Sequence, residues 1–358
     1  MDERMFAQLA NWLRDGPVVV CSVGQTQGAT PRKSGSRMLV SSASTSGSIG
    51  GGLAEARVLA RARSMLDENG GRAILDIDLA GQEQSAGICG GRMRIALRRL
   101  AGEAERLRVV GIASALQSGH RVPLPGEWLG GDIEAQVAVP DVRLIVAGAG
   151  HCGAALCELA AHLDFEICVF DSRSELLRGE AFARVAQRSD QLDAVSAWLQ
   201  TGRSVQAVLL NRNFEQDIAL LRVLCVRPPR FFGMLGSARR IAEVRRALPE
   251  FQVQLQDLVA PIGLAIGAQT PHEIAVSILA QLIEQRRVGA VGDDFHRQVV
   301  DLFRFLDALH VGREVGGLLQ RAGNRKHHVV SAERGTVVEG DFVAQLETQR
   351  GRVHLRPR

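Results

Sequence analysis

The sequence of 358 residues contains no tyrosine, and aromatic residues make up only 4% of it. This scarcity leaves no stacking platform for the bases of single-stranded nucleic acid, so we expect no nucleic-acid partner. No apolar run approaches the ~20 residues that cross a bilayer, so we expect no membrane partner. The charged start Met1–Arg4 also lacks the basic and apolar segments of a secretory signal, and we therefore expect a cytoplasmic protein.

Lysine is nearly absent as well, since it occurs only at Lys33 and Lys326, and arginine carries the basic charge of a chain with a formal net charge of +4. Arginine forks suit phosphate and carboxylate ligands, although the base composition of the genome explains the bias more simply. The six cysteines form no Cys-x-x-Cys pair and no zinc-like spacing. Dispersed cysteines of this kind are usually buried and reduced, and only Cys89 has neighbours that indicate another role.

The length favours two or three domains, and the pattern of apolar runs indicates where they divide. Residues 1–120 predict a small α/β domain. Its helices are expected at 5–14 and 53–67, its strands at 17–23, 37–40, 73–79 and 93–100, and loops at 25–35, 41–48 and 81–91. Residues 121–141 are rich in proline and glycine and are interpreted as a linker.

Residues 142–290 alternate strands with helices, a pattern typical of a doubly wound parallel sheet of the Rossmann type. We expect strands at 142–147, 166–170, 207–210 and 231–235, and helices at 153–162, 192–199, 214–223, 238–248 and 271–286. Residues 291–358 form a C-terminal extension of unassigned role. It contains an amphipathic stretch at 295–309 and, within 328–355, an alternation that suggests a small hairpin.

The run Gly148-Ala149-Gly150-His151-Cys152-Gly153 matches the G-x-G-x-x-G pattern between a strand and a helix. In this arrangement Gly148 allows a tight turn, Gly150 lets the backbone approach a pyrophosphate at the helix N-terminus, and Gly153 lets helix and strand pack closely. A second strand ends at Asp171, near the place of a ribose-binding acid. The motif predicts a dinucleotide-type site, and the alternative is a Rossmann scaffold without a ligand.

A second turn, Gly233–Arg240, also joins a strand to a helix. Backbone N–H groups after Gly236, together with Ser237 and Arg239, would suit an anion, and an ordinary strand-to-helix turn is the alternative. Near the end of the domain, Thr270 and Glu273 form a predicted capping box, which is a structural feature.

Two glycine-rich loops stand out in the first domain, Gly28–Arg32 and Gly47–Gly52, and the second leads to Glu55. Three glycines before a helix leave N–H groups free to form an anion cradle, to which Arg32 and Arg37 could add charge. Cys89 lies between glycines at 87 and 90–91, so its thiol could meet a soft metal or carry sulfur. A buried structural cysteine is the alternative.

In this order the motifs resemble the XdhC/CoxI family, whose members help to mature molybdenum hydroxylases of the xanthine dehydrogenase type. The resemblance runs through residues 18–290 and rests on Gly28–Arg32 with Gly35 and Arg37, Gly47–Glu55, Cys89-Gly90-Gly91, Gly148–Gly153, Asp171 with Arg173, Gly233–Arg240 and Pro261–Ala280. It implies a chaperone that binds molybdenum cofactor, as molybdopterin or its cytosine dinucleotide form. Such a protein protects the cofactor while a cysteine desulfurase supplies sulfur, and delivers it to an apo molybdenum hydroxylase.

From the motifs and the resemblance we expect cofactor binding by Arg32, Arg37, Ser48, Gly50, Gly51, Gly52, Glu55, Cys89, Gly90, Gly148, Gly150, His151, Gly153, Asp171, Gly236, Ser237 and Arg239. No residue is assigned to catalysis, and no metal ligands are assigned. The family often has cysteine where this chain has Leu53, a Thr-His-Asp-His-like run where it has Asn211–Phe214, and aspartate where it has Ala265. The first two departures remove possible thiol or metal ligands, so a metal-dependent activity is not expected at that edge.

An NAD(P)-dependent oxidoreductase is the competing hypothesis, because the G-x-G-x-x-G pattern also supports it. No acid–base pair for such a reaction stands out in the sequence, although His151 in the turn could be argued. A ligand-sensing or scaffold protein is the third hypothesis. We also expect a homodimer, because two-fold dimers are the commonest soluble assembly.

Overall fold

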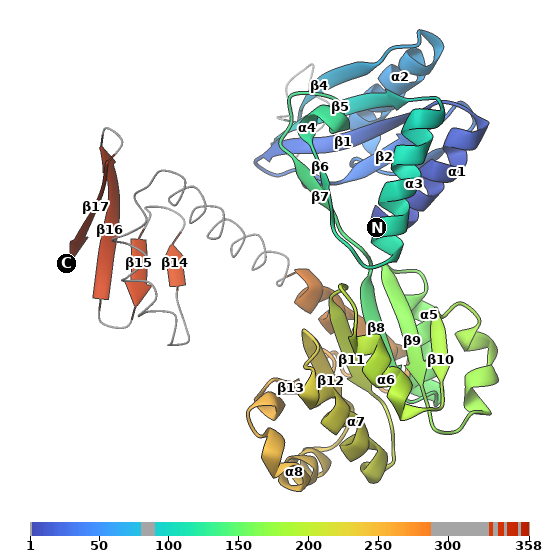
Figure 1. Cartoon of the computed structure of the whole chain (residues 1–358), viewed down its shortest axis with the longest axis vertical. Coiled ribbons are helices and arrows are strands. Elements are labelled where there is room, and N and C mark those ends of the chain that lie inside the picture. Colours follow the sequence, from blue (N-terminus) through green and yellow to red (C-terminus); the bar gives the residue numbers. More distant parts are fainter. Residues whose placement is uncertain are drawn as a thin grey trace. The chain divides into compact units, whose positions relative to one another are not determined.

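The structure is a computed structural model that describes residues 2–79, 90–287, 329–331, 336–339, 342–349 and 352–357 (Figure 1). The chain divides into two compact units, Met1–Gln285 and Arg286–Arg358. The first unit holds two large sheets, each with a hydrophobic core on both faces, and a two-stranded sheet. We call residues 2–138 the N-terminal lobe and residues 142–285 the Rossmann lobe.

The N-terminal lobe is built on an antiparallel sheet of five strands in the order β3-β2-β1-β5-β4. The strands are β1 (Val18–Gln27), β2 (Arg37–Val40), β3 (Thr45–Gly47), β4 (Arg72–Asp78) and β5 (Arg92–Leu100). Successive residues of β1 point to opposite faces. Val18 and Val20 face the core of α1 (Asp2–Asp15) and α3 (Glu103–Gln117), which pack against each other, whereas Val19 and Cys21 face α2 (Gly52–Asp67). Both faces are covered, which explains the unbroken apolar run at 18–21.

The predicted linker at 121–141 is wrong, because these residues are folded into the N-terminal lobe. They form β6 (Val122–Leu124), the short helix α4 (Gly126–Leu129) and β7 (Gln136–Ala138), and β6 pairs with β7. Trp128 and Leu129 are buried in the core beside α1 and α3. The glycines serve close contacts, since a Cβ on Gly126 would lie 1.9 Å from the Ile133 carbonyl oxygen. The loops expected at 25–35 and 41–48 are also partly wrong, since β1 extends to Gln27 and β3 forms.

The Rossmann lobe confirms the predicted fold class, because its six strands are all parallel, in the order β10-β9-β8-β11-β12-β13. They are β8 (Val142–Ala147), β9 (Phe165–Phe170), β10 (Gln187–Ser189), β11 (Val205–Leu209), β12 (Phe231–Met234) and β13 (Leu258–Val259). Helices α6 (Leu192–Leu199), α7 (Phe214–Val226) and α8 (Ala238–Ala247) share one core with this sheet. Helix α5 (His151–Ala160) and the helix at 271–287 share the other.

The second unit contains a four-stranded antiparallel sheet where the sequence predicted a small hairpin. Its strands follow chain order as β14 (Val329–Ser331), β15 (Thr336–Glu339), β16 (Phe342–Gln349) and β17 (Arg352–Pro357). The amphipathic stretch predicted at 295–309 lies outside the described residues.

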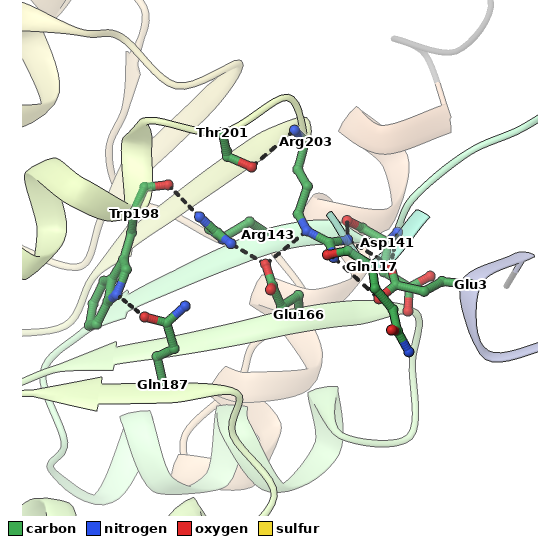
Figure 2. Close-up of polar contacts among 9 residues, drawn as sticks. All are labelled: Glu3, Gln117, Asp141, Arg143, Glu166, Gln187, Trp198, Thr201 and Arg203. Carbon is green, nitrogen blue, oxygen red and sulfur yellow. Dashed lines mark hydrogen bonds and ion pairs between the residues drawn. The ribbon is translucent and has the colours of Figure 1, made fainter. Parts of the chain in front are cut away.

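An arginine of the Rossmann lobe joins the two lobes of the first unit (Figure 2). The side chain of Arg203 is only 2% exposed and binds the Glu3 carboxylate of α1 at 2.6 Å and the Glu166 carboxylate of β9 at 3.1 Å. It also donates to the carbonyl oxygens of Asp141 and of Gln117, at the end of α3. The acidic residue Glu3 thus links α1 to the Rossmann lobe through an ion pair. From the sequence alone, this acidic segment served only to exclude a secretory signal.

Replacing Arg203 with methionine should lower the free energy of unfolding by about 3–5 kcal/mol, because Glu3 would lose the cation that pairs with it in a largely buried site and Glu166 would keep only Arg143. Thermal and denaturant unfolding measure this loss. Arg222→Met is the control, since Arg222 pairs with Glu250 while 58% exposed. That change should stay within about 0.5 kcal/mol of wild type. Equal effects of the two substitutions would contradict the central role of Arg203.

Candidate functional site

The three glycines of the Gly148–Gly153 turn differ in what surrounds them. Gly148 has φ +121°, and a Cβ there would lie 2.9 Å from the Leu210 backbone. A Cβ on Gly153 would lie 1.9 Å from the Gly148 carbonyl oxygen, so Gly153 permits close packing. Gly150, the residue before α5, has no atom within 4 Å of its Cβ position. The turn is therefore tight at its ends and open at Gly150, as a pyrophosphate site requires.

Asp171 lies at the predicted strand end, but its carboxylate is already bound. It is fully buried and accepts hydrogen bonds from the backbone N–H of Ala149, at 2.7 Å, and from the backbone and guanidinium of Arg173. Burial tends to raise the pKa of Asp171, but the hydrogen bonds from Arg173 and Ala149 hold that pKa below its ordinary value. Asp171 thus fixes the turn and is not free to receive a ribose hydroxyl.

At the turn after β12, Arg240 makes the buried contacts, whereas the sequence had led us to expect a role for Arg239. The side chain of Arg239 is 88% exposed and pairs with Glu243 on its own helix. Arg240 instead binds the fully buried Asp217 of α7 at 2.5 Å and donates to the Arg212 carbonyl oxygen. Ser237 caps α8 by accepting from the Arg240 backbone N–H. The expected capping of the helix at 271–287 is confirmed, since Thr270 and Glu273 exchange hydrogen bonds.

Asn211, which the sequence analysis noted only as a departure from the family pattern, lies inside this site. It follows β11 and is 6% exposed, and its Oδ1 lies 3.0 Å from where a Cβ on Gly148 would be. Burial raises the pKa of the nearby Asp217, and its pairing with Arg240 and a hydrogen bond from the Asn211 amide offset part of that shift. Strand order reverses between β8 and β11, and the carboxyl ends of such strands are where ligands bind. The sequence feature that could have pointed to Asn211 is that it is a polar residue directly after a buried strand.

The glycine loops of the N-terminal lobe come together. A Cβ on Gly50 would lie 2.5 Å from the Pro31 ring, so the 47–52 turn adjoins the 28–32 loop. A Cβ on Gly28 would lie 3.1 Å from the Gly90 carbonyl oxygen, so the segment that follows Cys89 adjoins the same loop. Arg32 is exposed at this place. Cys89 itself lies outside the described residues.

Glu55 fills the anion cradle that we predicted at 50–52. One carboxylate oxygen accepts from Ser48 Oγ at 2.6 Å and from the backbone N–H groups of Gly51 at 3.0 Å and Ile49 at 3.1 Å. Partial burial tends to raise the pKa of Glu55, but these hydrogen bonds hold it below its ordinary value. The expectation of free N–H groups there is wrong, because the protein supplies its own anion.

Arg37 is also committed to the fold. It is buried and donates to Asp2 at 2.6 Å and to Gln136 at 2.7 Å, so it holds α1 and β7 on β2 and does not supply charge to a ligand. Burial lowers the pKa of its guanidinium, and Asp2 offsets part of that shift.

His151 is exposed at the start of α5. Beside it, Cys152 is the one cysteine in the described part of the chain that is not buried.

These contacts decide which lobe fits a phosphate-bearing cofactor. The cradle of the N-terminal lobe already holds the Glu55 carboxylate, whereas no atom lies within 4 Å of the Cβ position of Gly150 in the Rossmann lobe. In the described residues no three histidine, cysteine or acidic side chains gather as a metal site. Across that same part of the chain no helix is long and apolar enough to span a membrane.

Glu55→Gln should lower the free energy of unfolding by about 1–3 kcal/mol at neutral pH, because a charged acceptor of three hydrogen bonds becomes a neutral amide. The folded-state pKa of Glu55 is depressed, so its stabilisation is fully present above the ordinary glutamate pKa, about 4.3, and is lost as the pH falls through the folded-state pKa. Urea unfolding between pH 7 and pH 3 should show the two proteins converging in acid. Equal stability of both at pH 7 would contradict this role, and the exposed Glu127→Gln serves as control.

Comparison with known proteins identifies two family domains in this chain. The XdhC Rossmann domain matches residues 144–282, and the XdhC and CoxI family matches residues 12–78. An uncharacterized protein, YqeB, from Escherichia coli is 28% identical over 75% of this chain and 43% of its own length. A probable xanthine dehydrogenase subunit from Bacillus subtilis is 30% identical over 42% of this chain and 45% of its own length. The chain thus spans less than half of either relative.

A solved structure shares the fold over most of the chain. The crystal structure of a xanthine dehydrogenase from Bacillus halodurans matches with a TM-score of 0.68 and 24% identity, over 79% of this chain and 96% of that one. The two family domains also occur in the order that the sequence motifs predicted. The chain therefore belongs to the XdhC and CoxI family.

Proposed function

We propose that this protein is an accessory factor that binds molybdenum cofactor, protects it and delivers it to an apo molybdenum hydroxylase of the xanthine dehydrogenase class. The proposal includes a cysteine desulfurase as the sulfur donor. One observation carries it: the XdhC Rossmann domain has an open glycine turn at Gly150, at the point where strand order reverses. The name of the Bacillus subtilis relative supports the same class of client.

The chemistry of the cofactor suits this turn. Molybdenum cofactor is a pterin with a phosphate, extended in one form by cytidine through a pyrophosphate. The first backbone N–H groups of a helix have no partner within the helix and favour negative charge, so the start of α5 next to Gly150 would hold the phosphate end. Ala149 is excluded, because its N–H already donates to Asp171.

In the N-terminal lobe we propose a contact with the sulfur-bearing end of the cofactor through Cys89. Thiolate is a good ligand for a soft metal and a good carrier of sulfur. Exposed Arg32 and the backbone at Gly90 adjoin the same loop and would add polar contacts. Gly50, Gly51 and Gly52 would act indirectly, by shaping the turn that Glu55 closes.

Gly150→Val should abolish binding of the phosphate end while the fold survives. The backbone at Gly150 has φ −74°, which valine adopts, and no atom lies within 4 Å of its Cβ position, so the side chain would occupy only space that a ligand needs. Equilibrium dialysis against the cytosine dinucleotide form and NAD+ measures affinity. Gly153→Val is the control, because its Cβ would meet the Gly148 carbonyl and unfold the lobe. Unchanged affinity of the Gly150 variant for both would contradict a nucleotide site there.

Cys89→Ser should reduce transfer of sulfurated cofactor to an apo-hydroxylase at least about tenfold, because serine keeps the size but removes the soft sulfur donor. The measurement is hydroxylase activity recovered from apoenzyme, with melting temperature recorded in parallel. Cys225→Ser is the matched control, since Cys225 is buried and should affect stability alone. Normal delivery with a large loss of stability would mark Cys89 as a core residue. Turnover of a nicotinamide cofactor by wild type, independent of Cys89, would favour the oxidoreductase hypothesis.

A further inference from the structure

The contacts that join the two lobes of the first unit lie at the amino ends of the Rossmann strands (Figure 2). Arg203 precedes β11 and binds Glu3 of α1 and Glu166, the second residue of β9. Arg4 of α1 donates to the Leu163 carbonyl oxygen at 2.7 Å, in the turn before β9. The N-terminal lobe is therefore attached to the edge of the sheet at which the parallel strands begin.

The glycine turn of the Rossmann lobe lies at the opposite edge of that sheet. Strand β8 has six residues and spans roughly 20 Å at about 3.3 Å per residue, and the turn around Gly150 follows its carboxyl end. Helices cover both faces of the sheet between the two edges. A ligand at Gly150 is thus held on the side of the Rossmann lobe that is turned away from the N-terminal lobe of its own chain.

The loops of the N-terminal lobe that we assign to the cofactor lie on the other side of the joint. The 28–32 loop adjoins the 47–52 turn, and the exposed side chain of Arg32 lies beside Gly50. A cofactor bound at Gly150 would have to extend past the whole Rossmann sheet to reach Arg32 of the same chain. The two residues can contact one cofactor molecule when they come from different chains.

Exposed apolar side chains accompany both places. Phe214, the first residue of α7, and Ile266, in the loop after β13, are exposed at the carboxyl edge of the Rossmann sheet. That loop begins at this edge, since the Ile262 N–H donates to the carbonyl oxygen of Met234, the last residue of β12. Beside the N-terminal loops, Leu53 is exposed at the start of α2. Large apolar side chains exposed around a binding place are typical of a surface that another chain covers.

We propose that the cofactor site is composite: the turn at Gly150 of one chain binds the phosphate end, and Arg32 of a second copy contacts the same molecule. This inference rests on the proposed function, because it distributes two contacts assigned there over two chains. A two-fold pair makes the same contact twice, so each pair of chains holds two complete sites. The homodimer expected from the sequence is then required for binding.

Two heterodimers that contain the same substitutions test this arrangement. Gly150→Val removes the Rossmann half of the site, and Arg32→Glu reverses the charge of the other half. In the first heterodimer each chain carries one substitution, and in the second one chain carries both and its partner is wild type. The chains are co-expressed with two different affinity tags and purified on both in turn. Each heterodimer is then loaded with the cytosine dinucleotide form of the cofactor, desalted and analysed for molybdenum.

A composite site predicts different results for the two heterodimers. The first combines two intact halves in one of its sites, so it should retain about half of the molybdenum of the wild-type dimer. The second has one substituted half in each site and should retain less than about a tenth of the wild-type amount, as two weakened sites would. Because both contain the same substitutions, a general loss of stability cannot produce this difference.

Ile266→Glu tests the surface between the two copies. This change should weaken self-association at least about tenfold in light scattering across a concentration series, because it places a charge in a surface that the second copy buries. Val226→Glu is the matched control, since Val226 is exposed at the opposite end of α7 from Phe214 and should leave self-association unchanged. Self-association that Ile266→Glu does not alter would overturn the surface assigned to the second copy.

Further results would overturn the composite site. Half retention by the second heterodimer and none by the first would place each site within one chain, while the proposed function survives. Equal retention by both heterodimers would show that the two halves do not contact one molecule. A wild-type chain that retains the cofactor as a monomer would have the same consequence. No retention by wild type would instead contradict the proposed function, and the inference with it.

Discussion

The ion pairs of Arg203 are the constraint on which the architecture of the first unit depends. One guanidinium, almost fully buried, binds carboxylates from α1 and from β9 and carbonyl oxygens next to α3 and β8. A buried cation needs such a set of acceptors, because the cost of removing it from water is otherwise not offset. The carboxylate of Glu3 also accepts from the Asp141 backbone, so the segment that leaves the N-terminal lobe is fixed at the same point.

A second theme is that the protein satisfies most of its own polar groups near the glycine turns. Glu55 accepts hydrogen bonds from N–H groups before α2, and Asp171 accepts one from the N–H of Ala149. Asp217 forms an ion pair with Arg240. Each of these carboxylates preorganises a turn whose glycines have little conformational preference of their own. The turn at Gly150, which the fold leaves open, then stands out as a position for a ligand.

The sequence predicted the elements whose signals are local. Strand β8, the turn at 148–153, helix α6 and the capping box at 270–273 follow from runs, spacing and glycine geometry within a few residues. Strands β10 and β13 were missed, because two or three residues carry no periodicity. The prediction of a linker at 121–141 was wrong because proline and glycine occur in the tight turns of a folded core as well as in linkers. Arg37, Glu55 and Arg239 were misjudged because the partner of a charged side chain depends on tertiary structure.

Binding of molybdenum cofactor to the wild-type chain tests the central claim most directly. Released cofactor should be retained at close to one molybdenum per chain when the protein is passed through a desalting column and analysed for metal, with a known carrier protein treated in parallel. The account predicts near-stoichiometric retention at micromolar concentration. No retention by this chain under conditions in which the known carrier is loaded would contradict the account.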